Sequence, residues 1–256
     1  MLLVIDVGNT NIVLGVMDGE DLVRTFRVST TDRTTDETGV LLLTLLENRG
    51  IERASVTGAI IGSVVPSVQY SLEKALRRYL DVEPLVVGKK LRTGMQIRTD
   101  NPREVGADRI VNGVAAWHAY GGPVVVVDFG TATTFDCVSA DCAYVGGAIA
   151  PGLRIAEQAL FSNTAKLPRV EVERPPAAIG TNTVHAIQSG LFWGYVGLVE
   201  SLVERCRAEL GKDARVVATG GLSRLIAPEV PAIEEVDGWL TLRGLRILYD
   251  MNVDRQ

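Results

Sequence analysis

Cysteine, histidine and aromatic residues are scarce in this chain. Among its 256 residues there are three cysteines and two histidines. Three cysteines are too few for a disulfide framework in a chain of this size, and two histidines provide too few ligands for a typical zinc site. Aromatic residues make up 5% of the chain and hydrophobic residues 46%, so aliphatic side chains must fill the core. The composition predicts a globular protein with reduced thiols.

A surplus of positive charge and a long apolar run are also missing. Acidic residues outnumber basic ones by 31 to 26, which gives a formal net charge of −5. Nucleic-acid-binding proteins usually carry a basic surplus, so we expect no nucleic-acid partner. No run of about 18 apolar residues is present, and only a short apolar segment precedes Asp6, so we expect neither a membrane span nor a signal peptide. These features predict a cytoplasmic protein.

Hydrophobic periodicity predicts an alternation of strands and helices. The first three strands are expected within residues 2–28, and further strands at 56–64, 85–87, 123–128, 144–150 and 216–219. Helices are expected at 35–48, 67–80, about 103–120, from 151–152 towards 161, 181 or 182 to about 210, and about 241–251. The segment 88–102 has no sustained periodicity and is interpreted as a long functional loop.

An internal repeat divides the chain. The strands expected at 2–6 and 123–128 both end in Asp-x-Gly followed by an amide or hydroxyl residue, at an offset of 122 residues. Each is followed by another expected strand. Because the offset is close to half the chain, we predict two duplicated domains, residues 1–117 and 118–256. The expected fold class is α/β, with mixed sheets flanked by helices.

The first copy, Asp6–Thr10, suits a metal–phosphate site. Gly8 lets backbone N–H groups approach phosphate oxygens, Asn9 and Thr10 add donors, and Asp6 can hold Mg²⁺ directly or through water. The same residues also suit an ordinary β-turn. The second copy, Asp128–Thr134, makes the ligand-binding interpretation the stronger one.

The second copy is rich in hydroxyls. Thr131, Thr133 and Thr134 can donate to phosphates or orient water, and Asp128 can bind a cation. The alternative is a strand with threonines on its solvent face, because threonine favours strands.

A third cluster, Gly106–Arg109, lies early in an expected helix. Asp108 can accept a proton from a substrate hydroxyl, and Arg109 can bind a carboxylate. Taken alone, these residues fit a pair of solvated helix charges better.

Three further segments have two interpretations each. Gly146–Gly152 and Thr219–Gly221 suit either tight turns or a close approach to phosphate or ribose. Thr181–Thr183 is expected to cap the long helix, and the Thr183 hydroxyl can also reach a ligand.

Two common nucleotide-binding motifs are absent. The sequence contains neither Gly-x-x-x-x-Gly-Lys-[Ser/Thr] nor a Gly-x-Gly-x-x-Gly after a strand. Its two Asp-x-Gly strands resemble instead those of the acetate kinase, sugar kinase, Hsp70 and actin superfamily. That resemblance implies duplicated ribonuclease H-like domains with ATP between them.

More specifically, the motifs resemble those of type III pantothenate kinases. The combination of Gly-x-Asp-Arg with Asp-x-Gly-Asn-Thr is highly specific to that family. The matching stretches span nearly the whole chain and are 6–10, 63–66, 101–109, 128–134, 146–152, 183–190 and 241–252. The resemblance implies ATP-dependent phosphorylation of pantothenate, the first step of coenzyme A synthesis. It also implies a homodimer that uses Mg²⁺ and a monovalent cation, K⁺ or NH₄⁺.

The resemblance also implies roles for single residues. The nucleotide phosphates would be bound by Asp6, Val7, Gly8, Asn9, Thr10, Asn11, Ile12 and Val13, and ATP also by Thr131. The metal ligands would be Asp6 and, for K⁺ or NH₄⁺, Asp128. Pantothenate would be bound by Gly106, Ala107, Asp108 and Arg109, with Asp108 as proton acceptor, and by Thr183, expected from the partner subunit. Thr99 stands where many relatives carry an aromatic residue and is included as a substrate contact.

Two other functions fit the same motifs. One is a different small-molecule kinase of this superfamily, such as a sugar kinase. The other is a nucleotide-binding regulatory protein without kinase turnover. ADP release with pantothenate, measured against a panel of sugars, separates all three.

Overall fold

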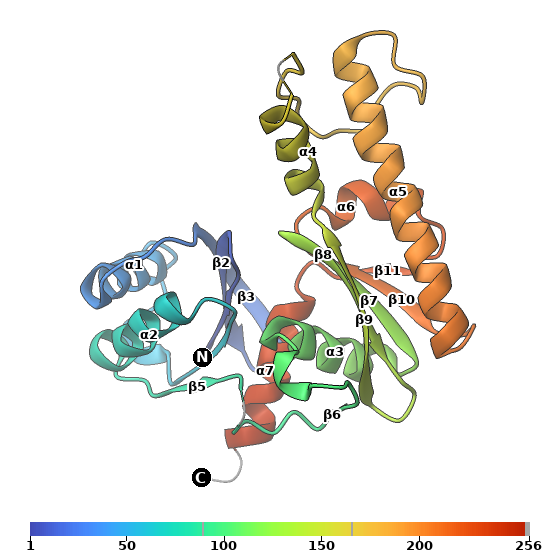
Figure 1. The fold of residues 1–256 in the computed structure, drawn as a ribbon. Coiled ribbons are helices and arrows are strands. Elements are labelled where there is room, and N and C mark those ends of the chain that lie inside the picture. Colours follow the sequence, from blue (N-terminus) through green and yellow to red (C-terminus); the bar gives the residue numbers. More distant parts are fainter. Residues whose placement is uncertain (89, 165, 254–256) are drawn as a thin grey trace. The chain divides into compact units, whose positions relative to one another are not determined.

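The computed structural model describes residues 1–88, 90–164 and 166–253. The chain forms two compact units. The first unit comprises Met1–Gly94, Arg103–Ala115 and Thr241–Gln256, and the second comprises Met95–Pro102 and Ala116–Leu240. Each unit contains one mixed sheet flanked by helices (Figure 1).

The sheet of the first unit has five strands in the order β3-β2-β1-β4-β5. The strands are β1 (Leu2–Val7), β2 (Asn11–Asp18), β3 (Asp21–Ser29), β4 (Gly58–Ser63) and β5 (Pro84–Val86). The first three form an antiparallel meander, and β4 and β5 add on in parallel. Strand β1 is central because it is almost entirely apolar, as expected of a strand buried on both faces.

Helices cover both faces of this sheet. On one face, α1 (Thr35–Glu47) and α2 (Pro66–Ala75), which continues as a π-helical turn (Leu76–Leu80), enclose an aliphatic cluster with the alternate residues Leu3, Ile5 and Val7 of β1. On the other face, α7 (Leu240–Val253) lies against strand glycines, since an added Cβ at Gly15 would come within 2.9 Å of Leu242. Asp6 alternates with Ile5 and Val7, so its side chain lies on the α7 face.

The sheet of the second unit has six strands in the order β11-β10-β7-β8-β9-β6. The strands are β6 (Gln96–Ile97), β7 (Val124–Phe129), β8 (Ala132–Val138), β9 (Ala143–Pro151), β10 (Arg215–Thr219) and β11 (Glu235–Val236). Its core order, β9-β8-β7-β10-β11, repeats β3-β2-β1-β4-β5 with the same antiparallel and parallel pairings. The predicted duplication and fold class are therefore confirmed.

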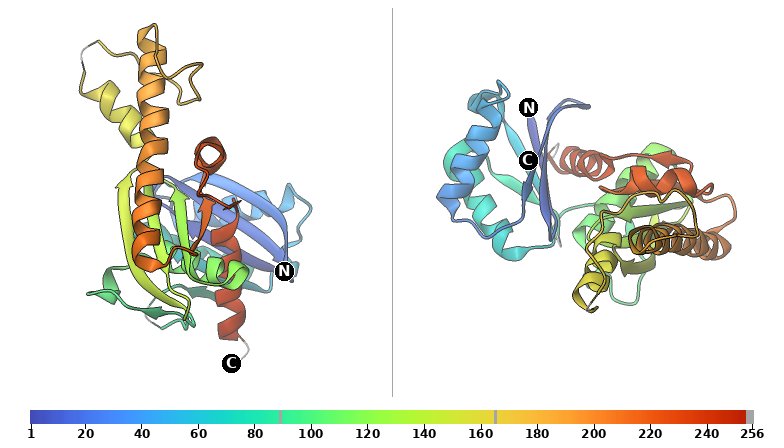
Figure 2. Two further views of the ribbon diagram at one scale, coloured as in Figure 1. Left: turned by 90° about the vertical axis from the view of Figure 1, so that its right-hand side faces the viewer. Right: turned by 90° about the horizontal axis from the view of Figure 1, so that it is seen from above.

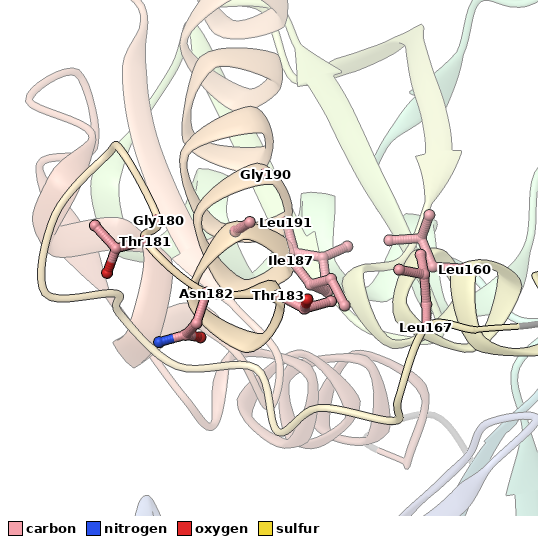
Figure 3. A pocket seen from close by; sticks show the side chains of 10 residues that line it. Leu160, Leu167, Gly180, Thr181, Asn182, Thr183, Ile187, Gly190 and Leu191 are labelled. Atoms are coloured by element: carbon pink, nitrogen blue, oxygen red, sulfur yellow. The ribbon is translucent and has the colours of Figure 1, made fainter.

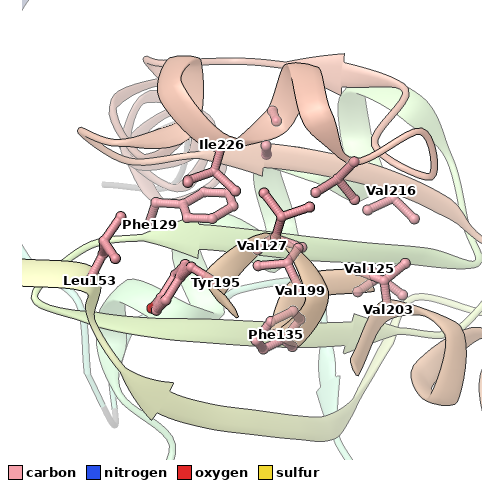
Figure 4. Close-up of a cluster of buried hydrophobic side chains, with 14 of the residues drawn as sticks. Val125, Val127, Phe129, Phe135, Leu153, Tyr195, Val199, Val203, Val216 and Ile226 are labelled. Carbon is pink, nitrogen blue, oxygen red and sulfur yellow. The ribbon is translucent and has the colours of Figure 1, made fainter. Parts of the chain in front are cut away.

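The long helix α5 (Thr183–Leu210) crosses one face of this second sheet. Its buried side chains pack with β7, β8 and β10 in a cluster that includes Val127, Phe135, Val199 and Val216 (Figure 4). The N-terminal part of α5 extends beyond the sheet of its own unit, with α4 (Leu153–Ser162) beside it (Figure 2). Helix α6 (Ser223–Ile226) follows β10.

The unit boundaries differ from the expected division at residue 117. Helix α3 (Ala107–Tyr120) belongs to the first unit as far as Ala115, and the last helix, α7, belongs to the first unit from Thr241 onward. Segment Met95–Pro102 belongs to the second unit because β6 pairs with β9. Short 3₁₀ helices lie at Arg53–Ser55, Pro102–Glu104 and Ala227–Glu229. Within the described ranges no helix is long and apolar enough to cross a membrane.

Candidate functional site

The first turn, between β1 and β2, is closed by local hydrogen bonds. The Gly8 N–H donates to Asn11 O at 3.0 Å, and Thr30 clamps the turn by donating through Oγ1 to Gly8 O at 2.7 Å and through its N–H to Thr10 O at 3.0 Å. Asn9 and Thr10 are exposed. The side chains of Asn9 and Thr10 therefore face solvent. The main chain of the turn is held by Thr30, the residue directly after β3.

The eight predicted nucleotide-binding residues divide by burial. Val7 and Ile12 are buried in the aliphatic core, paired with each other across β1 and β2. Their side chains therefore cannot touch a nucleotide from that position. Asp6 and Val13, the next pair of the ladder, are only partly buried. The side chains that this segment offers to a ligand come mainly from Asp6, Asn9 and Thr10.

The second turn, between β7 and β8, is enclosed by two glycines from distant segments. An added Cβ at Gly152 would lie 2.0 Å from Thr131 O and 2.9 Å from Gly130 O. An added Cβ at Gly220, which has φ +89°, would lie 2.5 Å from Asp128 Oδ1. The sequence left Gly146–Gly152 and Thr219–Gly221 ambiguous, and the structure brings both segments against the second turn.

The three threonines of the second turn have different environments. Thr131 is exposed, whereas Thr133 is buried and its hydroxyl lies 2.5 Å from the Tyr195 hydroxyl. Thr134 Oγ1 donates to Asp136 Oδ2 at 2.9 Å. The phosphate-binding interpretation therefore suits Thr131 best, because the Thr133 and Thr134 hydroxyls serve buried or half-buried partners within the unit.

Asp108 lies in the first turn of α3, within the first unit. It is partly buried, and its Oδ1 accepts the N–H of Arg109 at 2.9 Å. An added Cβ at Gly106 would lie 2.5 Å from the same Oδ1, so glycine makes room for this carboxylate. Negative charge is favourable at a helix N-terminus. The carboxylate is thereby held in one orientation at the start of the helix.

Helix α7 supports this part of α3. Thr241 Oγ1 donates to Asn112 Oδ1 at 2.7 Å, and Asn112 is almost fully buried. An added Cβ at Gly244 would lie 2.4 Å from Val111 O, so α3 and α7 are in backbone contact. The helix that covers the Asp6 face of the first sheet therefore also anchors the helix that carries Asp108.

Thr99 and Thr183 belong to the second unit. The Thr99 Oγ1 atom is enclosed and has no hydrogen-bond partner in the part of the chain that the structure describes. Thr183 is exposed at the first position of α5, directly after Asn182, whose side chain accepts the His185 N–H at 2.9 Å. The predicted capping role of this segment is confirmed.

An open depression of 610 Å³ lies beside the start of α5 (Figure 3). Its lining is mainly apolar and includes Leu160 of α4, Leu167 of the following linker, and Ile187 and Leu191 of α5. Thr183 also lines it. This predicted substrate-contact residue therefore lies on an exposed, largely apolar surface.

The described residues contain no group of three or more histidine, cysteine or acidic side chains that could hold a metal ion. Mg²⁺ needs no such cage, because it usually keeps several waters and binds one or two carboxylates together with substrate phosphates. Asp6, at the end of a strand beside an open turn, fits that pattern. Asp128 fits a monovalent cation. Its carboxylate lies beside Gly220, and a side chain at that position would occupy the space next to Oδ1.

Sequence reasoning missed two residues that support the turns. Thr30 clamps the first turn, and Tyr195 bonds to Thr133 beside the second. Neither carries a motif, because each acts through one buried or half-buried hydroxyl. A polar residue among the apolar positions of α5 is the only sequence signal for Tyr195.

Comparisons with known proteins agree with this architecture. The family model for type III pantothenate kinase matches residues 2–205. Proteins named type III pantothenate kinase from Geotalea daltonii and Myxococcus xanthus are each 55% identical to the chain, over 98% of it and 99% of the relative.

Solved structures show the fold alone. A Campylobacter jejuni protein assigned to the Baf family of transcriptional activators aligns with a TM-score of 0.59, 18% identity and coverage of 98% of this chain and 99% of that one. An inorganic polyphosphate/ATP-glucomannokinase from Arthrobacter aligns with a TM-score of 0.52, 16% identity and 98% coverage of both chains. Both likenesses extend over nearly the whole chain and concern the arrangement of its sheets and helices. On the match over most of its length and the identity to its relatives, the chain belongs to the type III pantothenate kinase family.

Proposed function

We propose that this protein transfers the γ-phosphoryl group of ATP to pantothenate, giving 4'-phosphopantothenate and ADP at the first step of coenzyme A synthesis. The observation that carries the proposal is family membership across nearly the whole chain. The two carboxylate-bearing turns support it, because they stand at equivalent places in two duplicated sheets.

The nucleotide would be bound by both turns. In the first turn, exposed Asn9 and Thr10 and the main chain up to Val13 can donate to phosphate oxygens. In the second, exposed Thr131 offers the hydroxyl that its neighbours Thr133 and Thr134 do not. Phosphoryl transfer leaves the protein chiefly the tasks of positioning and charge neutralisation.

Asp108 would act as the general base. The primary hydroxyl oxygen of pantothenate attacks the γ-phosphorus, the bond to the β–γ bridging oxygen breaks, and Asp108 accepts the hydroxyl proton. The Arg109 N–H holds one oxygen of Asp108, which leaves the other to face the acceptor. The Arg109 guanidinium would bind the pantothenate carboxylate, together with Gly106 and Ala107. The enclosed Thr99 hydroxyl would be a further contact.

Two cations complete the proposed site. Asp6 would hold Mg²⁺ with the phosphates, and Asp128 would hold K⁺ or NH₄⁺. When bound, these ions add positive charge next to the transferring phosphoryl group. The chain's own contribution is to fix both carboxylates at strand ends, Asp6 by the β1–β2 ladder and Asp128 by the β7–β8 and β7–β10 ladders.

We further propose a homodimer in which α5 faces a second copy of the chain. Gly190, Gly194 and Gly197 leave one side of α5 open, since an added Cβ at any of them would meet nothing within 4 Å. Large apolar side chains are exposed on the neighbouring surface: Ile155, Leu160, Phe161 and Val184. Exposed apolar patches of this kind mark interaction sites, and a two-fold axis would bury both copies of the patch at once. Thr183 would then reach the partner's pantothenate site.

Complementation tests the dimer. Asp108→Asn and Thr183→Ala subunits, each impaired alone, should regain activity in one pocket per heterodimer, because that pocket receives both normal residues. In the same model, Thr183→Ala raises KM for pantothenate more than KM for ATP. A monomer in light scattering at working concentration, or no recovery in verified heterodimers, would contradict it.

A cytoplasmic location is proposed on the basis of the substrate ATP and the thiols. No disulfide joins the cysteines that the structure describes. Reduced thiols are usual in the cytoplasm. Fractionation of cells, with the protein followed by antibody, checks this expectation.

A coupled ADP-release assay tests the reaction itself. We expect ADP release when pantothenate is added, none with a panel of sugars, and higher rates in K⁺ than in Na⁺. Mass spectrometry of the product should show one added phosphoryl group on pantothenate. Release only with a sugar would indicate a different kinase, and ATP binding that no acceptor converts to turnover would indicate a regulatory protein.

A further inference from the structure

Tyr195 of α5 forms a buried chain of hydrogen bonds across the second unit. Its hydroxyl donates to the main-chain O of Pro151 at 2.7 Å and lies 2.5 Å from Thr133 Oγ1. Tyr195 is 5% exposed and Thr133 is 1% exposed. Figure 4 shows the Tyr195 ring in the buried cluster beside Leu153, at the end where Phe129 also lies.

The direction of the chain follows from proton count. The phenol has one proton and Pro151 O can only accept, so Thr133 Oγ1 donates to the Tyr195 oxygen. Burial raises the pKa of Tyr195, while the hydrogen bond from Thr133 lowers it less, so the phenol keeps its proton at neutral pH. One helix residue therefore binds β8 through Thr133 and the end of β9 through Pro151.

Both attachment points border the second turn. Thr133 is two residues beyond Thr131, and Pro151 precedes Gly152, which lies against Thr131 O and Gly130 O. A shift of either strand end relative to α5 would therefore move the main chain around Thr131.

We propose that Tyr195 is a positioning residue that fixes the second phosphate turn for ATP by tying both of its borders to α5. The inference rests on the proposed ATP-dependent function but adds a residue that touches neither substrate. A purely structural tyrosine in the core would stabilise the unit without affecting nucleotide affinity, and the two roles separate experimentally.

Tyr195→Phe removes the proton given to Pro151 and the oxygen that accepts from Thr133. We expect the Kd for a non-hydrolysable ATP analogue and KM for ATP to rise about threefold to tenfold, in line with the loss of one or two buried hydrogen bonds. KM for pantothenate should stay within about twofold by the same reasoning, because neither bond borders Asp108. Concentrations are corrected for folded protein by circular dichroism.

Tyr144→Phe is the matched control. Tyr144 is also buried in the second unit, but its hydroxyl donates to Asp136 of β8, so this bond joins two strands of the sheet and not a strand end to α5. This variant should lower thermal stability and leave the Kd for the ATP analogue unchanged. Equal Kd values for wild type, Tyr195→Phe and Tyr144→Phe would overturn the proposal.

Thr133→Val provides an independent route, because it breaks only the β8 attachment. Alone it should weaken ATP-analogue binding as well. In Tyr195→Phe the Thr133 hydroxyl has lost its acceptor, and the double variant removes that hydroxyl as well. Thermal stability should therefore partly recover, while affinity for the ATP analogue should stay reduced. Recovery of both would overturn the positioning role. Binding of the ATP analogue needs no pantothenate. These measurements therefore test Tyr195 even if the wild-type protein does not phosphorylate pantothenate.

Discussion

The two Asp-x-Gly turns occupy equivalent places in duplicated sheets but are supported differently. The first turn is closed by its own residues and by Thr30, at the end of the adjacent strand. The second turn is enclosed by Gly152 and Gly220 and is tied to a helix by Tyr195. A duplicated motif can therefore keep its sequence pattern while the contacts that stabilise it differ. In the first turn they are mainly hydrogen bonds, and in the second they are mainly packing contacts from distant segments.

The largest effect is expected at Asp108, which belongs to α3 and to neither Asp-x-Gly turn. Asp108→Asn should lower kcat about 10²–10⁴-fold, the usual contribution of a general base, with ATP-analogue binding unchanged. Asp36→Asn is the control, because Asp36 is likewise an acidic residue in a first helical turn, on α1. A kcat near the wild-type value in Asp108→Asn would assign the base elsewhere.

The next prediction tests whether the second turn, through Asp128, holds the monovalent cation. Activity should be higher in K⁺ than in Na⁺, and Asp128→Ala should remove this preference and lower kcat/KM for ATP about tenfold to hundredfold, as expected for loss of an ionised acceptor. Asp141→Asn, an exposed carboxylate of the same unit, should behave as wild type. Equal rates in both salts for every variant would contradict a cation role for the second turn.

Glycine substitutions compare the packing of the turns directly. Gly152→Ala should reduce the free energy of unfolding by about 1–3 kcal/mol, because its Cβ would overlap Thr131 O and the backbone must shift. Gly8→Ala should change it by less than about 1 kcal/mol, since its Cβ would meet Asn11 O at 3.2 Å and Gly8 does not need a left-handed φ. Denaturant titration without ligand measures both. Similar losses would show that the turns are equally crowded.

The smallest effect concerns the clamp of the first turn. Thr30→Val removes the donor to Gly8 O and should raise KM for ATP about twofold to tenfold, the range expected for one hydrogen bond. Thr44→Val is the matched control and should leave KM for ATP unchanged, because Thr44 Oγ1 donates within α1 to Val40 O. If both variants had wild-type kinetics, the first turn would need no support from Thr30.

The sequence predicted the regular elements because each carries a long periodic signal. The helix expected at 35–48 is observed as Thr35–Glu47, and the helix expected to end near residue 210 does end at Leu210. Strands β6 and β11 were missed, since two-residue strands have no period and depend on their partners. The segment 88–102, interpreted as a loop, contains β6 for that reason.

The site could be predicted by residue type but not by environment. Thr133 suits a phosphate ligand and a buried strand residue equally well, and only packing against Tyr195 decides between them. Val7 and Ile12 were included in the nucleotide segment although they face the core. The roles of Asp6, Asp108, Asp128, Thr131, Thr183 and Thr99 stay predictions that the experiments above test.

The duplicated sheets also differ in how their outer edges resist aggregation. In the first unit the edge strand β3 carries exposed Arg24 and Arg27 and a register shift against β2, devices that discourage pairing with another chain. In the second unit the equivalent strand β9 is partly covered by β6, and the opposite edge is the two-residue β11. Segment Met95–Pro102 therefore covers part of the β9 edge in addition to carrying Thr99, and we expect deletions there to promote aggregation, which light scattering would detect.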